Sequence, residues 1–105
     1  MKNDLHKDYY EAILQIRPAR RDVLDFVFEL TDRRNDVKVS KVDELKTGYD
    51  VYLTDQKFAR GALATQLKRR FKGKIVITRK IYGVDKMTSR TLYRATVLFR
   101  LNSFQ

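Results

Sequence analysis

The sequence predicts an α+β fold, a two-layer sandwich in which two helices cover one face of an antiparallel-rich sheet. Several segments place apolar residues at alternate positions, as half-buried strands do, and two others place them three and four apart, as amphipathic helices do. No internal repeat, low-complexity run or linker divides the 105 residues, a length suited to a single core. The expected order is β-α-β-β-α-β-β, that of ferredoxin-like or split βαβ domains with an added strand.

The first strand and helix occupy residues 9–33. Residues 9–17 alternate, with apolar side chains on one side of the predicted strand. Pro18 suits the first position of a helix, which we expect to run to about Arg33. Its buried stripe consists of Val23, Phe26, Val27 and Leu30.

Two further strands are expected before the second helix. Asn35-Asp36 is a turn signal, and the valines at 37, 39 and 42 then mark a strand that acidic residues interrupt. Thr47-Gly48 predicts a turn into a third strand, residues 49–53, which alternates again.

The second helix is predicted to begin at a side-chain cap and to end at a glycine. Thr54 or Asp55 can accept a hydrogen bond from an amide of the first turn, and Gly73 is expected to end the helix. The expected buried side consists of Ala59, Ala62, Leu63, Leu67 and Phe71.

A β-hairpin completes the predicted domain. Residues 75–82 and 91–101 are rich in β-branched and aromatic side chains, and a long loop, residues 83–90, joins them. We therefore expect one domain over residues 9–101, preceded by a flexible terminus (1–8) and followed by a short tail (102–105).

Composition removes several function classes. The chain has no cysteine and one histidine, which excludes disulfides, a thiol nucleophile and a thiolate zinc site. It has no Gly-rich phosphate loop and no nucleophile elbow, so we expect no enzyme activity and no cofactor. The acids of the first helix are interleaved with arginines, and we expect no metal site there. Without a long apolar stretch or a signal-peptide pattern, the protein is expected to be soluble and cytoplasmic, with no membrane partner.

Charge divides the chain into two unlike halves. Residues 1–55 contain 10 Lys and Arg against 12 Asp and Glu, whereas residues 56–105 contain 13 against Asp85 alone, so their net charges are −2 and +12. One-sided positive charge repels itself, and an anionic partner would offset this repulsion. We predict that the later helix and the hairpin bind RNA phosphates through Lys57, Arg60, Lys68, Arg69, Lys72, Lys74, Arg79, Lys80, Lys86, Arg90 and Arg94.

The sheet face away from the helices offers a second way to bind RNA. If Ile75 and Ile77 face the helices, then Val76, Thr78, Lys80 and Tyr82 share the open face with Arg94, Tyr9 and Tyr52. Aromatic rings among cations can stack unpaired bases, although the sequence lacks the RRM signature and exposed strand tyrosines are common without any such role.

Three segments resemble a known family. They are YYEAILQIR (9–17), GYDVYLTDQKFARGALATQLKRRF (48–71) and KIYGVDKMTSRTLYRATVLFRL (80–101). Together they are similar to a domain of the large-ribosomal-subunit nuclear export adaptors, the nonsense-mediated decay protein three family, and in particular to its archaeal members. Neither of the most specific pieces, YDVYLTD and YRATVLFRL, is a catalytic motif.

The resemblance implies a protein that binds the large ribosomal subunit in biogenesis, export or surveillance. The matching part is the family's ribosomal-protein-like (eL22-like) module. The zinc module expected before it and the translation-factor-like domain expected after it are absent from this sequence. We therefore expect one monomeric, non-catalytic domain whose partners are large-subunit rRNA and ribosomal proteins.

Two other functions are compatible with the sequence. One is a protein-interaction module, in which the acidic first helix or an open sheet edge docks a ribosomal protein or a neighbouring domain. The other is a small phosphatase or metal-dependent nuclease on the same scaffold, for which no catalytic residues are apparent.

Overall fold

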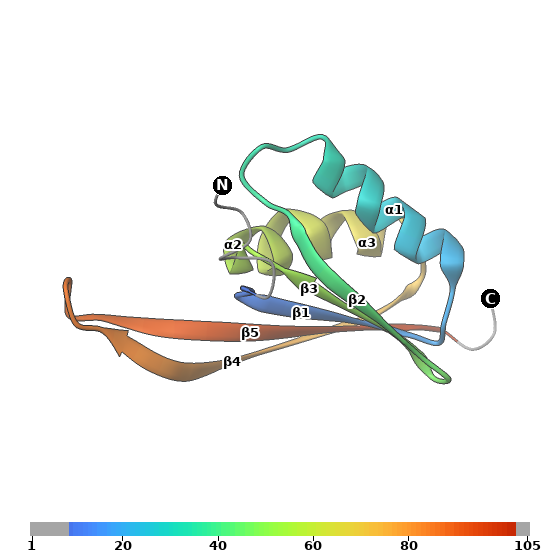
Figure 1. Cartoon of the computed structure of the whole chain (residues 1–105). Helices are drawn as coiled ribbons and strands as arrows, with labels where there is room; N and C mark the ends of the chain where they lie inside the picture. Colours follow the sequence, from blue (N-terminus) through green and yellow to red (C-terminus); the bar gives the residue numbers. More distant parts are fainter. Residues whose placement is uncertain (1–8, 103–105) are drawn as a thin grey trace.

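The computed structural model describes residues 9–102, apart from the side chains of three hairpin residues, Tyr82, Asp85 and Arg90. Five strands form one sheet, and the helices lie together over one of its faces (Figure 1). The strands are β1 (Ala12–Arg17), β2 (Val39–Leu45), β3 (Gly48–Leu53), β4 (Gly73–Asp85) and β5 (Arg90–Leu101). The predicted two-layer α+β fold and its element order are confirmed.

The strand order is β2-β3-β1-β5-β4. β1 pairs with β5 in parallel, and the other three pairings are antiparallel. The added strand of the predicted fold is thus β5, which lies between β1 and the edge strand β4. Because β1 and β5 run in the same direction, their carboxyl ends meet at one end of the sheet.

The core lies between the sheet and the helices. The alternation predicted for residues 9–17 is confirmed from Ala12 to Arg17, since Ala12, Leu14 and Ile16 are fully buried and the residues between them are not. Residues 9–11 precede β1 and do not continue the alternation. β5 contributes Val97 and Phe99, also fully buried. The opposite sheet face carries no layer of described residues (Figure 1).

Helix α1 (Arg21–Asp32) begins later than predicted. Pro18 is not its first residue: it follows a cis peptide bond with Arg17, and Arg20 is still extended at the N-cap. The first turn begins where the Asp22 carboxylate accepts a hydrogen bond from the Val23 amide. The predicted stripe is confirmed, because Val23 and Val27 are buried and Phe26 and Leu30 pack against the core.

The second helix contains a π-helical turn that the sequence pattern did not predict. It comprises α2 (Gln56–Phe58), η2 (Ala59–Leu63) and α3 (Ala64–Arg70). The predicted cap is correct for Asp55, whose carboxylate accepts from the Lys57 amide at 2.9 Å. A π turn takes more residues than an α turn, so it rotates later side chains around the axis. As a result Ala62 is exposed, against our prediction, and Ala64 is buried.

Two other boundaries in this region were only partly predicted. Helix α3 ends at Arg70, and Gly73 is not its cap but the first residue of β4. A Cβ at Gly73 would lie 2.5 Å from the Arg100 carbonyl oxygen, so glycine is required by the close approach of β4 to β5. β2 begins at Val39 and includes the acids expected to interrupt it, while Val37 is buried ahead of the strand.

The hairpin is longer and its connection shorter than predicted. Half of the expected loop, residues 83–90, belongs to the strands, and residues 86–89 form the turn. The register shifts between Ile81 and Gly83, where β4 has one more residue than the facing part of β5. Figure 1 shows the far half of the hairpin extending beyond the helices. Ile77 pairs with the fully buried Val97 but is 40% exposed, because β4 is an edge strand of the sheet.

Candidate nucleic-acid interface

The predicted RNA-binding cations do not form one surface. Strand register places Lys74 opposite Arg100 and Lys80 opposite Arg94, and the alternation along β5 puts all four on the open sheet face. Arg79 lies opposite the buried Ala95, so it points to the helix side, where it lines a hollow together with Lys57 and Arg60. The sheet therefore separates two groups of cations that the sequence alone could not distinguish.

The remaining predicted cations lie around the end of helix α3 and in or beside the hairpin turn. Lys68, Arg69 and Lys72 are exposed at the C-terminal end of α3 and just after it. Lys86 is exposed in the hairpin turn, and the side chain of Arg90 lies outside the described residues. Among the described residues, no carboxylate lies within ion-pairing distance of these lysines, whereas ion pairs such as Arg21–Asp25 stabilise the early half.

A row of cations crosses the end of the open face, and two of its members were not among the predicted site residues. Arg17 is aligned with Arg100 across the parallel β1–β5 pairing, and Arg100 is aligned with Lys74 across β5–β4. Arg17 and Arg100 were both interpreted as ordinary strand positions. Their alternation could have shown that they share the open face, since each lies one residue after a buried core position of its strand.

Arg17 is held in place by the surrounding backbone and one acid. Its guanidinium donates to the Asp50 carboxylate at 2.8 Å and to the Ile16 and Tyr49 carbonyl oxygens at 3.0 and 3.2 Å. The Arg17 and Asp50 side chains are both 17% exposed, so the pair is partly shielded from solvent. Such a fixed guanidinium loses little side-chain entropy on binding a ligand.

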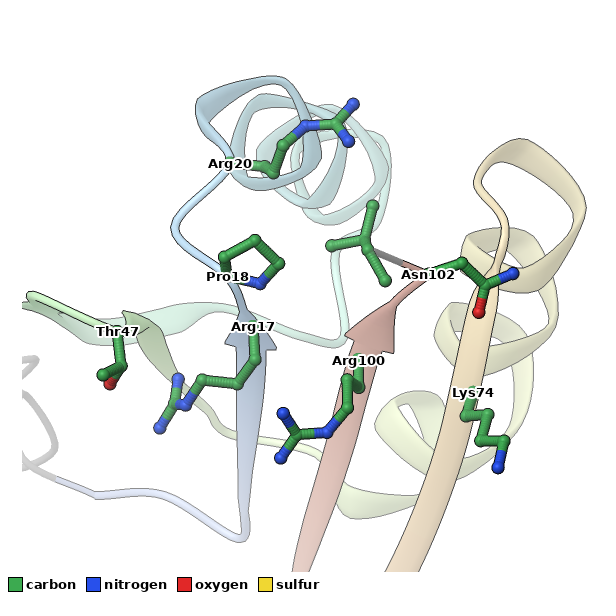
Figure 2. A pocket seen from close by; sticks show the side chains of 8 residues that line it. Arg17, Pro18, Arg20, Thr47, Lys74, Arg100 and Asn102 are labelled. Atoms are coloured by element: carbon green, nitrogen blue, oxygen red, sulfur yellow. The ribbon is translucent and has the colours of Figure 1, made fainter. Parts of the chain in front are cut away.

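The row lines a hollow at the carboxyl ends of β1 and β5 (Figure 2). Its volume is about 1060 Å³. In Figure 2 the Arg17 and Arg100 side chains extend from neighbouring strands on the same side of the sheet, and Lys74 extends from the next strand. The lining residues are Arg17, Pro18, Arg20, Thr47, Lys74, Arg100, Leu101 and Asn102, a set that contains four cations and no acid.

A second row on the open face interleaves tyrosines and cations. Lys41 lies 4.6 Å from the Tyr52 ring centre, Tyr52 meets Tyr10 edge to face at 4.9 Å, and Arg94 lies 4.1 Å from the Tyr10 ring centre. The Tyr52 pKa is raised, first by burial and then by the nearby Asp43 carboxylate. Each ring thus already contacts a cation and the other ring, which leaves less ring surface for a stacked base than predicted.

The other two predicted stacking tyrosines do not join this row. Tyr9 lines the helix-side hollow and its hydroxyl donates to Glu11 at 2.5 Å. The side chain of Tyr82 lies outside the described residues.

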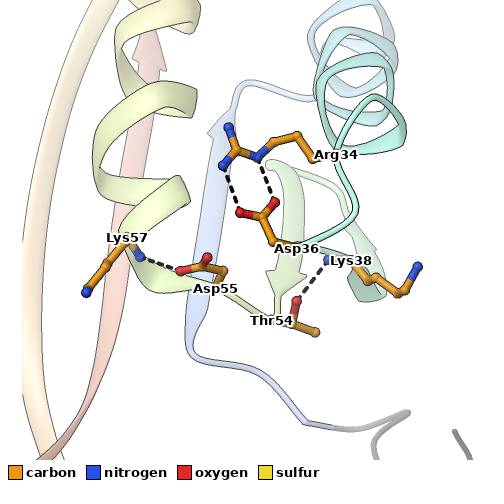
Figure 3. A network of polar contacts seen from close by, with 6 residues as sticks. All are labelled: Arg34, Asp36, Lys38, Thr54, Asp55 and Lys57. Atoms are coloured by element: carbon orange, nitrogen blue, oxygen red, sulfur yellow. Dashed lines mark hydrogen bonds and ion pairs between the residues drawn. The ribbon is translucent and has the colours of Figure 1, made fainter.

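Acids near the helix-side hollow have structural partners (Figure 3). Asp36 accepts two hydrogen bonds from Arg34, both 2.9 Å, and this pairing lowers the Asp36 pKa. Thr54 accepts from the Lys38 amide, which ties the loop after α1 to the end of β3. Asp55 accepts a hydrogen bond from the Lys57 backbone amide, and in Figure 3 the Lys57 ammonium points away from the Asp55 carboxylate.

The described residues were also compared with the requirements of a metal site and of a membrane-spanning helix. No group of three or more histidine, cysteine, aspartate or glutamate side chains within residues 9–102 could hold a metal ion. The helices that the structure describes are all too short or too polar to cross a membrane.

Comparison with known proteins identifies the family. Residues 9–101 match the family model described as the second domain of NMD3. The chain belongs to the NMD3 family. The match covers the sheet and both helical segments, and a search of the curated proteins found no match. Membership of the NMD3 family confirms the predicted resemblance and associates this domain with ribosomal subunits, while its archaeal and eL22-like character stay predictions.

Proposed function

We propose that this NMD3 domain is a non-catalytic, cytoplasmic module that binds the large ribosomal subunit by contacting rRNA phosphates. The contacts come from the basic end of helix α3 and from the β4–β5 hairpin. Their role is to neutralise charge rather than to read bases. The observation that supports this proposal is the net charge of +12 in residues 56–105, where Asp85 is the only acid in the sequence, in a chain that belongs to the NMD3 family.

The shape of the hairpin suits this role. It extends beyond the helices, so Lys80 and Lys86 can approach a large partner that the rest of the domain does not reach (Figure 1). Lysines on an edge strand also discourage pairing with other strands, which is the ordinary reason to find them there. RNA binding therefore has to be tested with variants that keep the edge polar.

The test is a filter-binding titration on large and small ribosomal subunits at two salt concentrations. Two variants reverse exposed charges: Lys68→Glu with Lys72→Glu at the helix end, and Lys80→Glu with Lys86→Glu in the hairpin. Removing one phosphate contact should reduce the slope of log affinity against log salt by about 0.7 to 0.9. Each double variant should therefore flatten that slope by about 1.4 to 1.8.

The matched control reverses two exposed lysines of the early half. Lys38→Glu with Lys46→Glu changes the net charge by the same amount and should leave the slope unchanged. Circular dichroism checks that every variant is folded. Equal retention by both subunits would reject large-subunit binding and leave only nonspecific polyanion binding. An equally flattened slope in the control would reject rRNA contact through these surfaces.

A protein partner is the second candidate function. Ile81 and Val84 are 65% and 59% exposed on the projecting hairpin, which is more apolar surface than a purely electrostatic contact needs. Under this alternative, binding would be insensitive to salt between about 50 and 200 mM and would weaken in Ile81→Ser.

A further inference from the structure

We propose that the hollow at the carboxyl ends of β1 and β5 binds two consecutive phosphodiester groups of an RNA strand. The identity of the polymer rests on the proposed function, while the anion site itself follows from the geometry. The family match does not assign this site, and of the cations that line it only Lys74 was predicted from the sequence.

The spacing of charge along the row favours an anionic ligand. Arg100 lies between Arg17 and Lys74 in the register, so three cations stand on adjacent strands at one level of the sheet. Like charges directly across a strand pair destabilise a sheet. Asp50 compensates Arg17, but among the described residues no acid pairs with Arg100 or Lys74. Two positive charges therefore remain to be balanced, which matches two singly charged phosphodiesters.

Two glycines give the backbone the shape that places these side chains. A Cβ at Gly48 would lie 2.7 Å from an Arg17 guanidinium nitrogen, so glycine leaves the space in which that side chain rests. At Gly73 the same substitution would collide with the Arg100 carbonyl, so glycine lets β4 begin beside Arg100 and brings Lys74 level with it. Both glycines thus serve the geometry of one cation row.

The size and composition of the hollow suit a nucleic-acid backbone. A volume of about 1060 Å³ is far more than one inorganic phosphate needs and accommodates a stretch of sugar-phosphate backbone. Thr47 and Asn102 add neutral hydrogen-bond donors to the lining. Arg20 also lines the hollow, but Asp22 already accepts two hydrogen bonds from it at 3.0 and 2.6 Å.

The helix-side hollow is a weaker candidate for the same ligand. It contains Lys57, Arg60 and Arg79, but acids such as Glu11 and Asp55 line it as well. The Arg60 Nε atom and the Gln56 Oε1 atom are buried there without partners among the described residues. They belong to residues four positions apart on the same helix, beside these acids.

The experiment is a titration of ¹⁵N-labelled domain followed by amide chemical shifts. The probe is a ribotrinucleotide that has hydroxyl ends and two internal phosphodiesters, and inorganic phosphate is titrated separately at the same ionic strength. We expect the trinucleotide to shift the amides of residues 17, 74, 100 and 102 and to bind more tightly than inorganic phosphate.

Two variants and one control make the test specific. Lys74→Gln and Arg100→Gln remove the two uncompensated charges and should each weaken trinucleotide binding by about tenfold or more, as expected when a charged hydrogen bond is removed. Lys38→Gln, exposed and outside the hollow, should leave it unchanged.

Each contrary outcome overturns a different part of the proposal. Shifts centred elsewhere, or full affinity in both variants, would overturn the site. Tighter binding of inorganic phosphate would overturn the RNA assignment and make the hollow a site for a free anion. Because the titration uses no ribosome, failure to bind subunits with an intact trinucleotide response would refute the proposed function alone.

Discussion

Replacing Gly48 by alanine should destabilise the domain and disturb the cation row together. The added methyl carbon would lie 1.9 Å from the Ile16 carbonyl oxygen and 2.7 Å from an Arg17 guanidinium nitrogen. The carbonyl belongs to the central strand β1, which is paired on both sides and cannot move alone. Gly61, in the second helix, is the matched control, since an added methyl there meets nothing within 4 Å.

The expected size of the effect follows from these two environments. Overpacking costs about 1 to 3 kcal/mol, and we expect the upper end because the obstacle is backbone. Gly61→Ala should instead stabilise the domain by about 0.5 to 1 kcal/mol, since alanine favours a helix over glycine. At about 4 to 8 °C per kcal/mol, Gly48→Ala should lower the melting temperature by more than about 10 °C.

Urea unfolding followed by circular dichroism measures both variants against the parent chain. The trinucleotide titration then reports whether Arg17 is still in position, at a temperature where Gly48→Ala remains folded. A Gly48→Ala variant within about 0.5 kcal/mol of the parent would refute the reasoning, because that is the scatter expected of a harmless surface change.

Three further outcomes are expected. Phe99→Ala, at a fully buried side chain, should lower the free energy of unfolding by about 3 to 5 kcal/mol in urea titrations, and a decrease below about 1 kcal/mol would contradict the described core. The raised pKa of Tyr52 favours its neutral phenol in the fold, so its contribution to stability is complete below the ordinary value of 10.0 and is lost as pH rises through the higher folded value. Absorbance near 295 nm should therefore show one late-titrating tyrosine that Tyr52→Phe removes and that Asp43→Asn shifts partly back; an unchanged curve in Tyr52→Phe would contradict this assignment. Ile81→Ser, at a side chain that is 65% exposed, should change stability by less than about 0.5 kcal/mol, and a larger decrease in urea would mean that the hairpin packs against other parts of the domain.

Much of the fold was predictable because it depends on local patterns. The alternation from Ala12 to Arg17 and the spacing of Val23 and Val27 are visible in the chain itself, and burial confirmed both. The Asp55 cap was also predictable, because a carboxylate two residues before an amide needs no distant partner.

The errors arose where the helical period changes or where distant segments decide the local structure. Ala62 was predicted to be buried because an α-helical period was assumed, and the π turn rotates it outward. Gly73 was interpreted as a helix cap, but its role is to admit the Arg100 backbone, which lies on another strand. Half of the expected hairpin loop is strand, because residues 83–85 find partners on β5.

Residue order was enough to establish the fold class, the NMD3 family and the excess of positive charge in the second half, since each of these can be read along the chain. The division of that charge between the two sides of the sheet depended instead on the folded chain. Its cause is strand register, because neighbours across a sheet are distant in the sequence. Register brought Arg17, a residue of the acidic half, level with Arg100 and Lys74 of the basic half.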